Sequence, residues 1–379
     1  MNMKKFLLIV SLFPLLSFAA ADAEKINFIL GIKLLDSSPS WKIADLHRRT
    51  GLPLRGTPGR YSVKMKQPVA GVPAEELIAY TAKNSRMVNR ITIVFANKGD
   101  TSGKYKSKIK DAGSLLSTRI SSAAGNKKRS QFVSGNYRNK ADMWQFNGGK
   151  IYLEVNKKEF VMLHIVPDKA AADKKSSVNT DYRKNIVKNS FGDVYIKNIP
   201  MVDQGAKGYC VPATMERIFL YYGIQLDMHH IAEIGDTERG GGTYLNKMLR
   251  DINTLRKKSG LRTTRFSALS VKTVATHIDK GNPVMWAMFS TRELQSLYLF
   301  SKQKRPQAAS PQEWQKKIRK ADIPKKEAGP HVCLIIGYNA ITDEIAVSNS
   351  WGQMHIAPTW IPVKAARKIS QKHLQAFYP

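Results

Sequence analysis

The segment Gln204-Gly-Ala-Lys-Gly-Tyr-Cys210 stands directly before an apolar stretch with helical periodicity. Apolar residues from Val211 to Tyr222 recur at i, i+4, i+7 and i+11, which places them on one helix face, and Gly223 follows as a stop signal. The sequence therefore predicts a helix that begins at Cys210. A thiol at this position meets unpaired backbone N–H groups and the positive end of the helix macrodipole, and both favour the thiolate.

Two polar residues follow more than a hundred residues later. His331 precedes the apolar segment Val332–Tyr338, which predicts a strand, and residues 344–348 are expected to return as its hairpin partner. Asn349 directly follows this predicted strand and begins the sequence Asn349-Ser-Trp-Gly352. Helices that precede a sheet along the chain indicate an α+β fold.

A thiol, a distant histidine and a distant amide in this chain order are what a cysteine hydrolase requires. His331 would accept the proton of Cys210 and later pass it to the leaving amine. Asn349 would orient the imidazole, and Trp351 would cover their hydrogen bond and exclude water. The side-chain N–H of Gln204 and the backbone N–H of Cys210 would stabilise the developing oxyanion.

These residues resemble the papain-like cysteine peptidase superfamily. Four residues fall at its positions for oxyanion glutamine, nucleophile, base and orienting asparagine: Gln204, Cys210, His331 and Asn349. The sequence of residues 349–352 is close to that of papain. The sequences of residues 210–213 and 220–223 look more like those of the bacteriocin-processing, double-glycine peptidases. Those peptidases usually orient their histidine with an aspartate, and here Asn349 takes that position.

The resemblance covers residues 191–360 and says nothing about residues 24–166. It implies a papain-like domain in which the helix bearing the nucleophile packs on an antiparallel sheet. It also implies hydrolysis of peptide or isopeptide bonds in a peptide or protein substrate, through a thioester intermediate. Two alternatives stay open: an acyltransferase that uses the same triad, and a non-catalytic, cationic envelope-binding protein on a papain-like scaffold. The intact set of four residues argues against the scaffold.

The length of 379 residues indicates two domains. Residues 1–21 have the features of a secretory signal peptide, with Lys4 and Lys5, an apolar stretch and small residues at the cleavage site. No other stretch approaches a membrane span. We therefore expect a secreted or periplasmic bacterial protein, with a smaller α+β domain at 24–166, a linker at 167–190 and the papain-like domain at 191–379.

The N-terminal half has the sequence features of a mixed α+β domain. Residues 91–95 predict a strand, and three segments predict a meander: 142–146, 151–155 and 160–166. Helices are predicted to begin at Pro73 and at Lys104. No constellation of catalytic residues is evident here, because His47 and His164 are isolated in the sequence.

The formal net charge is +32, which favours attraction to an anionic envelope polymer, although a basic but merely solvated surface fits equally. No nucleic-acid fingerprint accompanies it. The basic segment 302–326 is expected to be a solvated helical insertion rather than a lid. Cys210 and Cys333 are expected to be free thiols, with Cys333 buried. No cofactor or metal is expected, because the adjacent His229 and His230 point apart on a helix.

Overall fold

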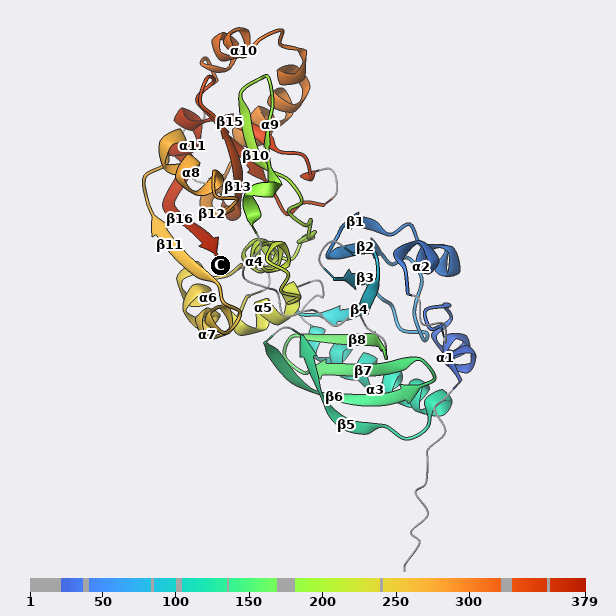
Figure 1. Cartoon of the computed structure of the whole chain (residues 1–379). Helices are drawn as coiled ribbons and strands as arrows, with labels where there is room; N and C mark the ends of the chain where they lie inside the picture. Colours follow the sequence, from blue (N-terminus) through green and yellow to red (C-terminus); the bar gives the residue numbers. More distant parts are fainter. Residues whose placement is uncertain are drawn as a thin grey trace, which may run out of the picture.

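The computed structural model describes residues 22–36, 41–82, 85–99, 104–134, 136–168, 181–238, 241–321, 329–352 and 355–379. The predicted signal peptide and residues 169–180 of the predicted linker lie outside these ranges. The described chain forms two antiparallel sheets, each with its own helices (Figure 1). Within these ranges, no helix combines the length and apolar character needed to cross a bilayer.

The N-terminal sheet has the strand order β1-β2-β3-β4-β8-β7-β6-β5, and all its pairs are antiparallel. Its strands are β1 (Arg55–Thr57), β2 (Arg60–Lys64), β3 (Glu76–Thr81), β4 (Val88–Asn97), β5 (Lys128–Ser134), β6 (Tyr137–Phe146), β7 (Gly149–Asn156) and β8 (Phe160–Pro167). Its helices are α1 (Ala23–Leu30), α2 (Ile43–Thr50) and α3 (Tyr105–Ala124). Apolar side chains of α1 and α3 share one core with one face of this sheet.

The predicted strand at 91–95, the meander and the helix near Lys104 are confirmed by β4, β6–β8 and α3. The helix predicted to begin at Pro73 is wrong, because Glu76–Thr81 is strand β3. Every residue of β3 is buried, since Leu77 faces the core below α3 and Ile78 faces a second core on the opposite side of the sheet. Burial of both faces removes the alternation that would have marked a strand.

The second sheet has the order β11-β16-β12-β13-β10-β9, with β14 paired to β13 and β15 paired to β14. Its strands are β9 (Ile186–Lys188), β10 (Asp193–Ile196), β11 (Arg262–Phe266), β12 (Val284–Ser290), β13 (Gly329–Asn339), β14 (Glu344–Ser348), β15 (Thr359–Pro362) and β16 (Ser370–Tyr378). The helices of this half are α4 (Cys210–Tyr221), α5 (Met228–Ile234), α6 (Leu245–Asp251), α7 (Asn253–Lys258), α8 (Val271–Ile278), α9 (Arg292–Lys304), α10 (Pro311–Ile318) and α11 (Val363–Ile369). The protein is thus α+β with two sheets, as expected. Strand β9 lies inside the predicted linker at 167–190 and pairs with β10, which follows the linker.

The basic insertion is helical, as predicted, but it is also fastened to the sheet. Arg305, which follows α9, donates hydrogen bonds to the carboxylates of Asp193 on β10 and Glu344 on β14. Trp314 of α10 is fully buried and donates its indole N–H to Glu344 at 2.9 Å. Residues 322–328 of this segment lie outside the described ranges.

Helices α4 and α5 lie between the two sheets (Figure 1). One side of α4 packs on β13 of the second sheet. Side chains of α4 and α5 also share a core with the face of the N-terminal sheet opposite α3; its residues are Ile78, Tyr80, Val94, Phe160 and Met162 on the sheet, with Val202, Tyr209, Ala213, Leu220, Met228 and Ala232. Every residue of α4 after Cys210 is buried. The N-terminal domain therefore covers the helix that carries the predicted nucleophile.

A buried polar network crosses this interface. Arg60 of β2 donates from Nε to Glu216 of α4 at 3.1 Å and from Nη2 to Glu76 of β3 at 3.2 Å. The Tyr80 hydroxyl oxygen lies 3.2 Å from a carboxylate oxygen of Glu216 and 3.0 Å from one of Asp227, the N-cap of α5. One guanidinium thus serves carboxylates from both domains in the interior, where an unpaired charge is costly.

We expect Arg60→Met to lower the free energy of unfolding by about 3–5 kcal/mol, because Glu216 and Glu76 would stay buried without their cation. Urea denaturation monitored by circular dichroism measures this loss. The matched control is Arg48→Met, which removes an exposed ion pair to Asp45 and should change stability by no more than about 0.5 kcal/mol. Equal effects of the two substitutions would show that the buried network does not hold the domains together.

Candidate active site

Cys210 is the first residue of α4 and is half-buried, whereas the rest of the helix is buried. The helix begins there because Tyr209 has a non-helical conformation (φ −90°, ψ 30°) and the preceding loop turns at Gly205 and Gly208, both with positive φ. The backbone N–H of Val332, the residue after His331, is close enough to the Cys210 thiol to lower its pKa. The Thr214 hydroxyl donates to the Val332 carbonyl at 3.2 Å, one helical turn further on. These contacts place the start of α4 against β13 at the residue next to His331.

His331 and Asn349 are brought together by the pairing of β13 with β14. Leu334 lies opposite Ser348 in this hairpin, so Asn349 at the end of β14 returns toward the start of β13. His331 Nε2 and Asn349 Oδ1 are 2.9 Å apart, and the two residues are 6% and 2% exposed. With Asn349 Oδ1 as the acceptor, Nε2 carries the proton, and the other ring nitrogen, Nδ1, is then available as a base.

Trp351 stacks on His331, with ring centroids 5.0 Å apart and an interplanar angle of 25°. Its other contacts are edge-on to His355 and tilted to Tyr298, at 5.3 and 6.3 Å. The indole therefore shields the imidazole that bonds Asn349, as its place in the sequence predicted. His355 touches Trp351 and has no described hydrogen bond to the other predicted residues.

Gln204 lies in the loop before α4, and its backbone N–H donates to the Ser350 carbonyl at 2.9 Å. The loop is thereby tied to the segment that carries Asn349. The side-chain oxygen of Gln204 is buried and has no hydrogen-bond partner among the described residues. Nothing in that range therefore fixes this amide in the orientation that an oxyanion donor requires.

Arg217 is a positioning residue that the sequence analysis missed. It is buried on α4 and donates from Nε to the Pro200 carbonyl at 2.9 Å and from Nη1 to the Ser348 carbonyl at 3.0 Å. One side chain thus fastens the loop before Gln204 and the strand before Asn349 to the helix that begins at Cys210. The available signal was a charged residue inside an otherwise apolar helical stretch.

The Cys210 thiol and the His331 imidazole are both shifted toward their neutral forms. Burial raises the pKa of the Cys210 thiol, and backbone hydrogen bonds from Val332, Val211 and Cys210 itself oppose this only in part. Burial lowers the pKa of His331, and the hydrogen bond to Asn349 opposes it. The free protein therefore favours a neutral thiol at Cys210 and a neutral imidazole at His331, although the helix start alone predicted a thiolate.

Cys333 is fully buried, and both cysteines are free, as predicted. Burial raises the pKa of the Cys333 thiol, which is consistent with an inert core residue. His229 and His230 bond different partners, Asp227 and Glu154, so they do not act as a pair. Over the described ranges, the group with metal-ligating geometry is Glu154, His164 and His230, which is separate from the residues around Cys210.

A pocket of about 250 Å³ lies where the two domains meet beside this site. Met201, Asp203 and Gly352 line it from the C-terminal half, next to Gln204 and Trp351 in the chain. The remaining lining residues come from the N-terminal half and include the basic residues Arg55 and Lys64. The N-terminal domain therefore borders the region in which the predicted catalytic residues lie.

Residues 196–368 match the Peptidase_C39 like family. Among solved structures, a putative C39-like peptidase from Bacillus anthracis is 11% identical, with a TM-score of 0.34, over 49% of this chain and 98% of that chain. The peptidase domain of Streptococcus ComA, a bifunctional ABC transporter involved in a quorum-sensing pathway, is 12% identical, with a TM-score of 0.31, over 48% of this chain and 99% of that chain. A comparison with curated proteins gives no match.

We expect Cys210 to react as a protonated thiol in the free protein. Because burial raises its pKa, the rate of alkylation by iodoacetamide should rise about tenfold per pH unit between about pH 7 and pH 9. Cys333→Ala should be labelled at the same rate, whereas Cys210→Ala should be labelled only after denaturation. A rate that is independent of pH from about 6 to 8 would instead indicate a preformed thiolate–imidazolium pair.

Proposed function

Because residues 196–368 form a Peptidase C39-like domain with the papain-like fold, we propose that this protein is an exported cysteine peptidase. Its substrate class is a peptide or protein, and Cys210, His331 and Asn349 form its triad. The observation that carries the proposal is the 2.9 Å contact between His331 Nε2 and Asn349 Oδ1. The residue after His331, Val332, accepts a hydrogen bond from Thr214 on the helix that begins at Cys210.

In the proposed mechanism, His331 acts first as a base. It takes the Cys210 proton as the sulfur attacks the substrate carbonyl, so no ion pair needs to exist beforehand. Asn349 holds the ring and stabilises the imidazolium by accepting its N–H. The imidazolium then protonates the leaving amine, and a thioester remains on Cys210. Water, deprotonated by His331, hydrolyses the thioester and releases the acid product.

The oxyanion formed in each step is stabilised by two N–H donors, the backbone of Cys210 and the side chain of Gln204. The support for this assignment is that the Gln204 backbone N–H donates to the Ser350 carbonyl, which ties this loop to the segment that carries Asn349. One such donor contributes roughly 3 kcal/mol of transition-state stabilisation. Arg217 is a positioning residue, because it acts through Pro200 and Ser348 rather than on substrate.

The N-terminal domain is proposed to be a permanent part of the enzyme rather than an inhibitory segment that is removed. Its sheet buries one side of α4 and α5, and Arg60 supplies the cation for Glu216 on α4. Removal would expose that apolar face and leave Glu216 without its partner.

We expect Gln204→Ala to lower kcat by about 10²–10³ with KM nearly unchanged, because its N–H stabilises charge that exists only in the transition state. Cys210→Ala should abolish turnover and leave the fold intact. Asn349→Ala should retain partial activity, since His331 would be misoriented but present. Initial rates on a quenched fluorescent peptide library measure these effects.

Cys333→Ala is the matched control, because it removes a thiol from the same domain outside the proposed triad, and it should retain the wild-type kcat. An increase in KM alone for Gln204→Ala would make this residue a substrate contact and refute the oxyanion assignment. Labelling of Cys210 by a peptide electrophile no faster than an ordinary thiol, together with no cleavage, would favour the non-catalytic scaffold. Product that carries an added amine in place of water would favour acyl transfer.

Export is proposed from the sequence of residues 1–21. Small residues at 19–21 and at 21–23 offer two cleavage sites, after Ala21 or after Ala23, and α1 favours the first. Asp22 caps this helix by accepting the backbone N–H of Glu24 at 2.9 Å, and Ala23 is buried. Cleavage after Ala21 keeps the cap, whereas cleavage after Ala23 removes it. An N-terminal cap contributes about 1 kcal/mol.

We therefore expect the mature protein recovered from the periplasm or the medium to begin at Asp22. N-terminal sequencing and intact mass measure this directly. A chain that begins at Glu24 would contradict the role of the cap, and an uncleaved chain confined to the cytoplasm would refute export.

A further inference from the structure

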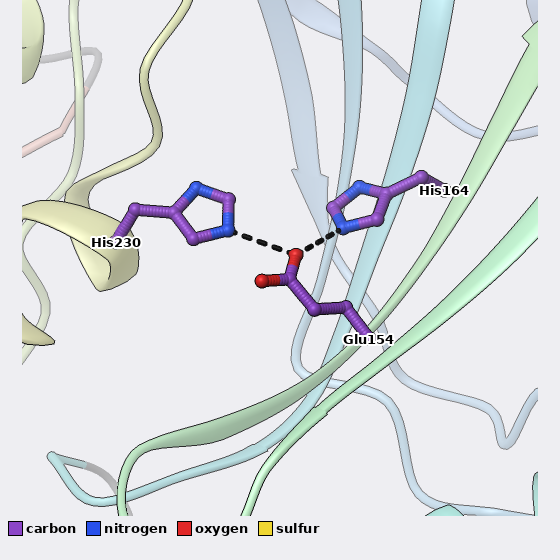
Figure 2. Close-up of side chains that lie close together, drawn as sticks. All are labelled: Glu154, His164 and His230. Carbon is purple, nitrogen blue, oxygen red and sulfur yellow. Dashed lines mark hydrogen bonds and ion pairs between the residues drawn. The ribbon is translucent and has the colours of Figure 1, made fainter. Parts of the chain in front are cut away.

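Glu154, His164 and His230 form a buried cluster at the domain interface (Figure 2). Glu154 is on β7 and His164 on β8 of the N-terminal sheet, whereas His230 is on α5 of the peptidase half. Glu154 Oε2 is 3.0 Å from His164 Nε2 and 2.9 Å from His230 Nε2. One ligand atom from each residue lies within 4.8 Å of the other two, and no residue of the three is more than 1% exposed.

The surroundings hold these side chains in place. The Thr92 hydroxyl lies 3.0 Å from His164 Nδ1, and Asn139 donates to Glu154 Oε1 at 2.5 Å. Phe132 stacks on His164 with centroids 3.7 Å apart and an interplanar angle of 5°, and the Tyr137 ring lies 4.2 Å from His230. In protein metal sites, the ligands are oriented by hydrogen-bond partners on the ring nitrogen and the carboxylate oxygen that do not contact the metal.

The chemistry of the three inner atoms selects a class of ion. Two imidazole nitrogens and one carboxylate oxygen suit a divalent transition metal, and Zn²⁺ commonly takes a His₂Glu set with one further ligand. The outer nitrogen of His230 is buried without a hydrogen-bond partner in the described chain, so no contact there fixes the tautomer that keeps a proton on Nε2. Nε2 can therefore lose that proton to an ion.

We propose that Glu154, His164 and His230 bind a zinc ion that joins the N-terminal sheet to helix α5. The ion compensates the Glu154 carboxylate in an interior where an isolated charge is costly. It also couples the two domains, since two ligands come from one domain and one from the other. The function of this ion is structural, because the ligands are buried and belong to a cluster separate from Cys210. The inference does not depend on the proposed peptidase activity.

Zinc content of the full-length protein tests the site directly. All measurements use a Cys210→Ala background, so that a thiol near His331 cannot bind the ion. Protein grown with zinc and passed over a chelating resin should retain about one Zn²⁺ per chain by plasma mass spectrometry. Co²⁺ substitution should give the visible d–d absorption of a four-coordinate nitrogen–oxygen site.

His230→Gln should lose the retained zinc, and His229→Gln is the matched control. The two residues are adjacent on α5 and equally buried, but His229 bonds Asp227 rather than Glu154. His229→Gln should therefore keep about one Zn²⁺ per chain. Glu154→Gln should weaken zinc binding, measured by competition with a fluorescent chelator, at least tenfold.

Thermal unfolding separates loss of the ion from loss of the fold. A chelator should lower the Tm of the parent protein and leave the Tm of folded His230→Gln unchanged. Two results would overturn the proposal. One is a parent protein that neither retains nor binds Zn²⁺ while Tm is insensitive to the chelator, which would leave a metal-free ion pair of Glu154 with a protonated histidine. The other is equal zinc loss in His229→Gln and His230→Gln.

Discussion

Helix α4 has both sides buried, and the rest of the molecule is arranged around that constraint. One side packs on β13, and the other shares a core with the N-terminal sheet. A helix in this position can carry polar side chains only where partners are available. Arg217 bonds Pro200 and Ser348, and Glu216 bonds Arg60 and Tyr80. These buried bonds hold the start of the helix, and with it Cys210, in a fixed relation to the loops on either side.

The same constraint gives the N-terminal domain a structural function. Its sheet has a core under α3 on one face and the interdomain core on the other, so β3, β4 and β8 are buried on both sides. Such a sheet cannot separate from α4 and α5 without exposing apolar surface and charged groups together. The Glu154–His164–His230 cluster lies in the same interface, so this interface contains both buried ionisable side chains and buried apolar side chains.

The electrostatics of the candidate site follow from its burial rather than from the helix macrodipole. Burial raises the pKa of Cys210 and lowers that of His331, so both tend toward neutrality in the free protein. Trp351 contributes to this by stacking on the imidazole. Under the proposed mechanism, a neutral thiol and a neutral imidazole require the proton to move during attack, and a protonated thiol reacts slowly without substrate.

The sequence alone determined the helix at Cys210, the strand after His331 and the hairpin that ends at Asn349, because each depends on local periodicity and turns. It failed at Glu76–Thr81, where burial of both strand faces erased the alternation. It also treated His164 as isolated, because Glu154 is ten residues away and His230 lies in the other domain. Only the tertiary structure decided that these three meet, and that Arg217 joins the loop at Pro200 to the end of strand β14, because contacts between distant segments leave no local pattern in the chain.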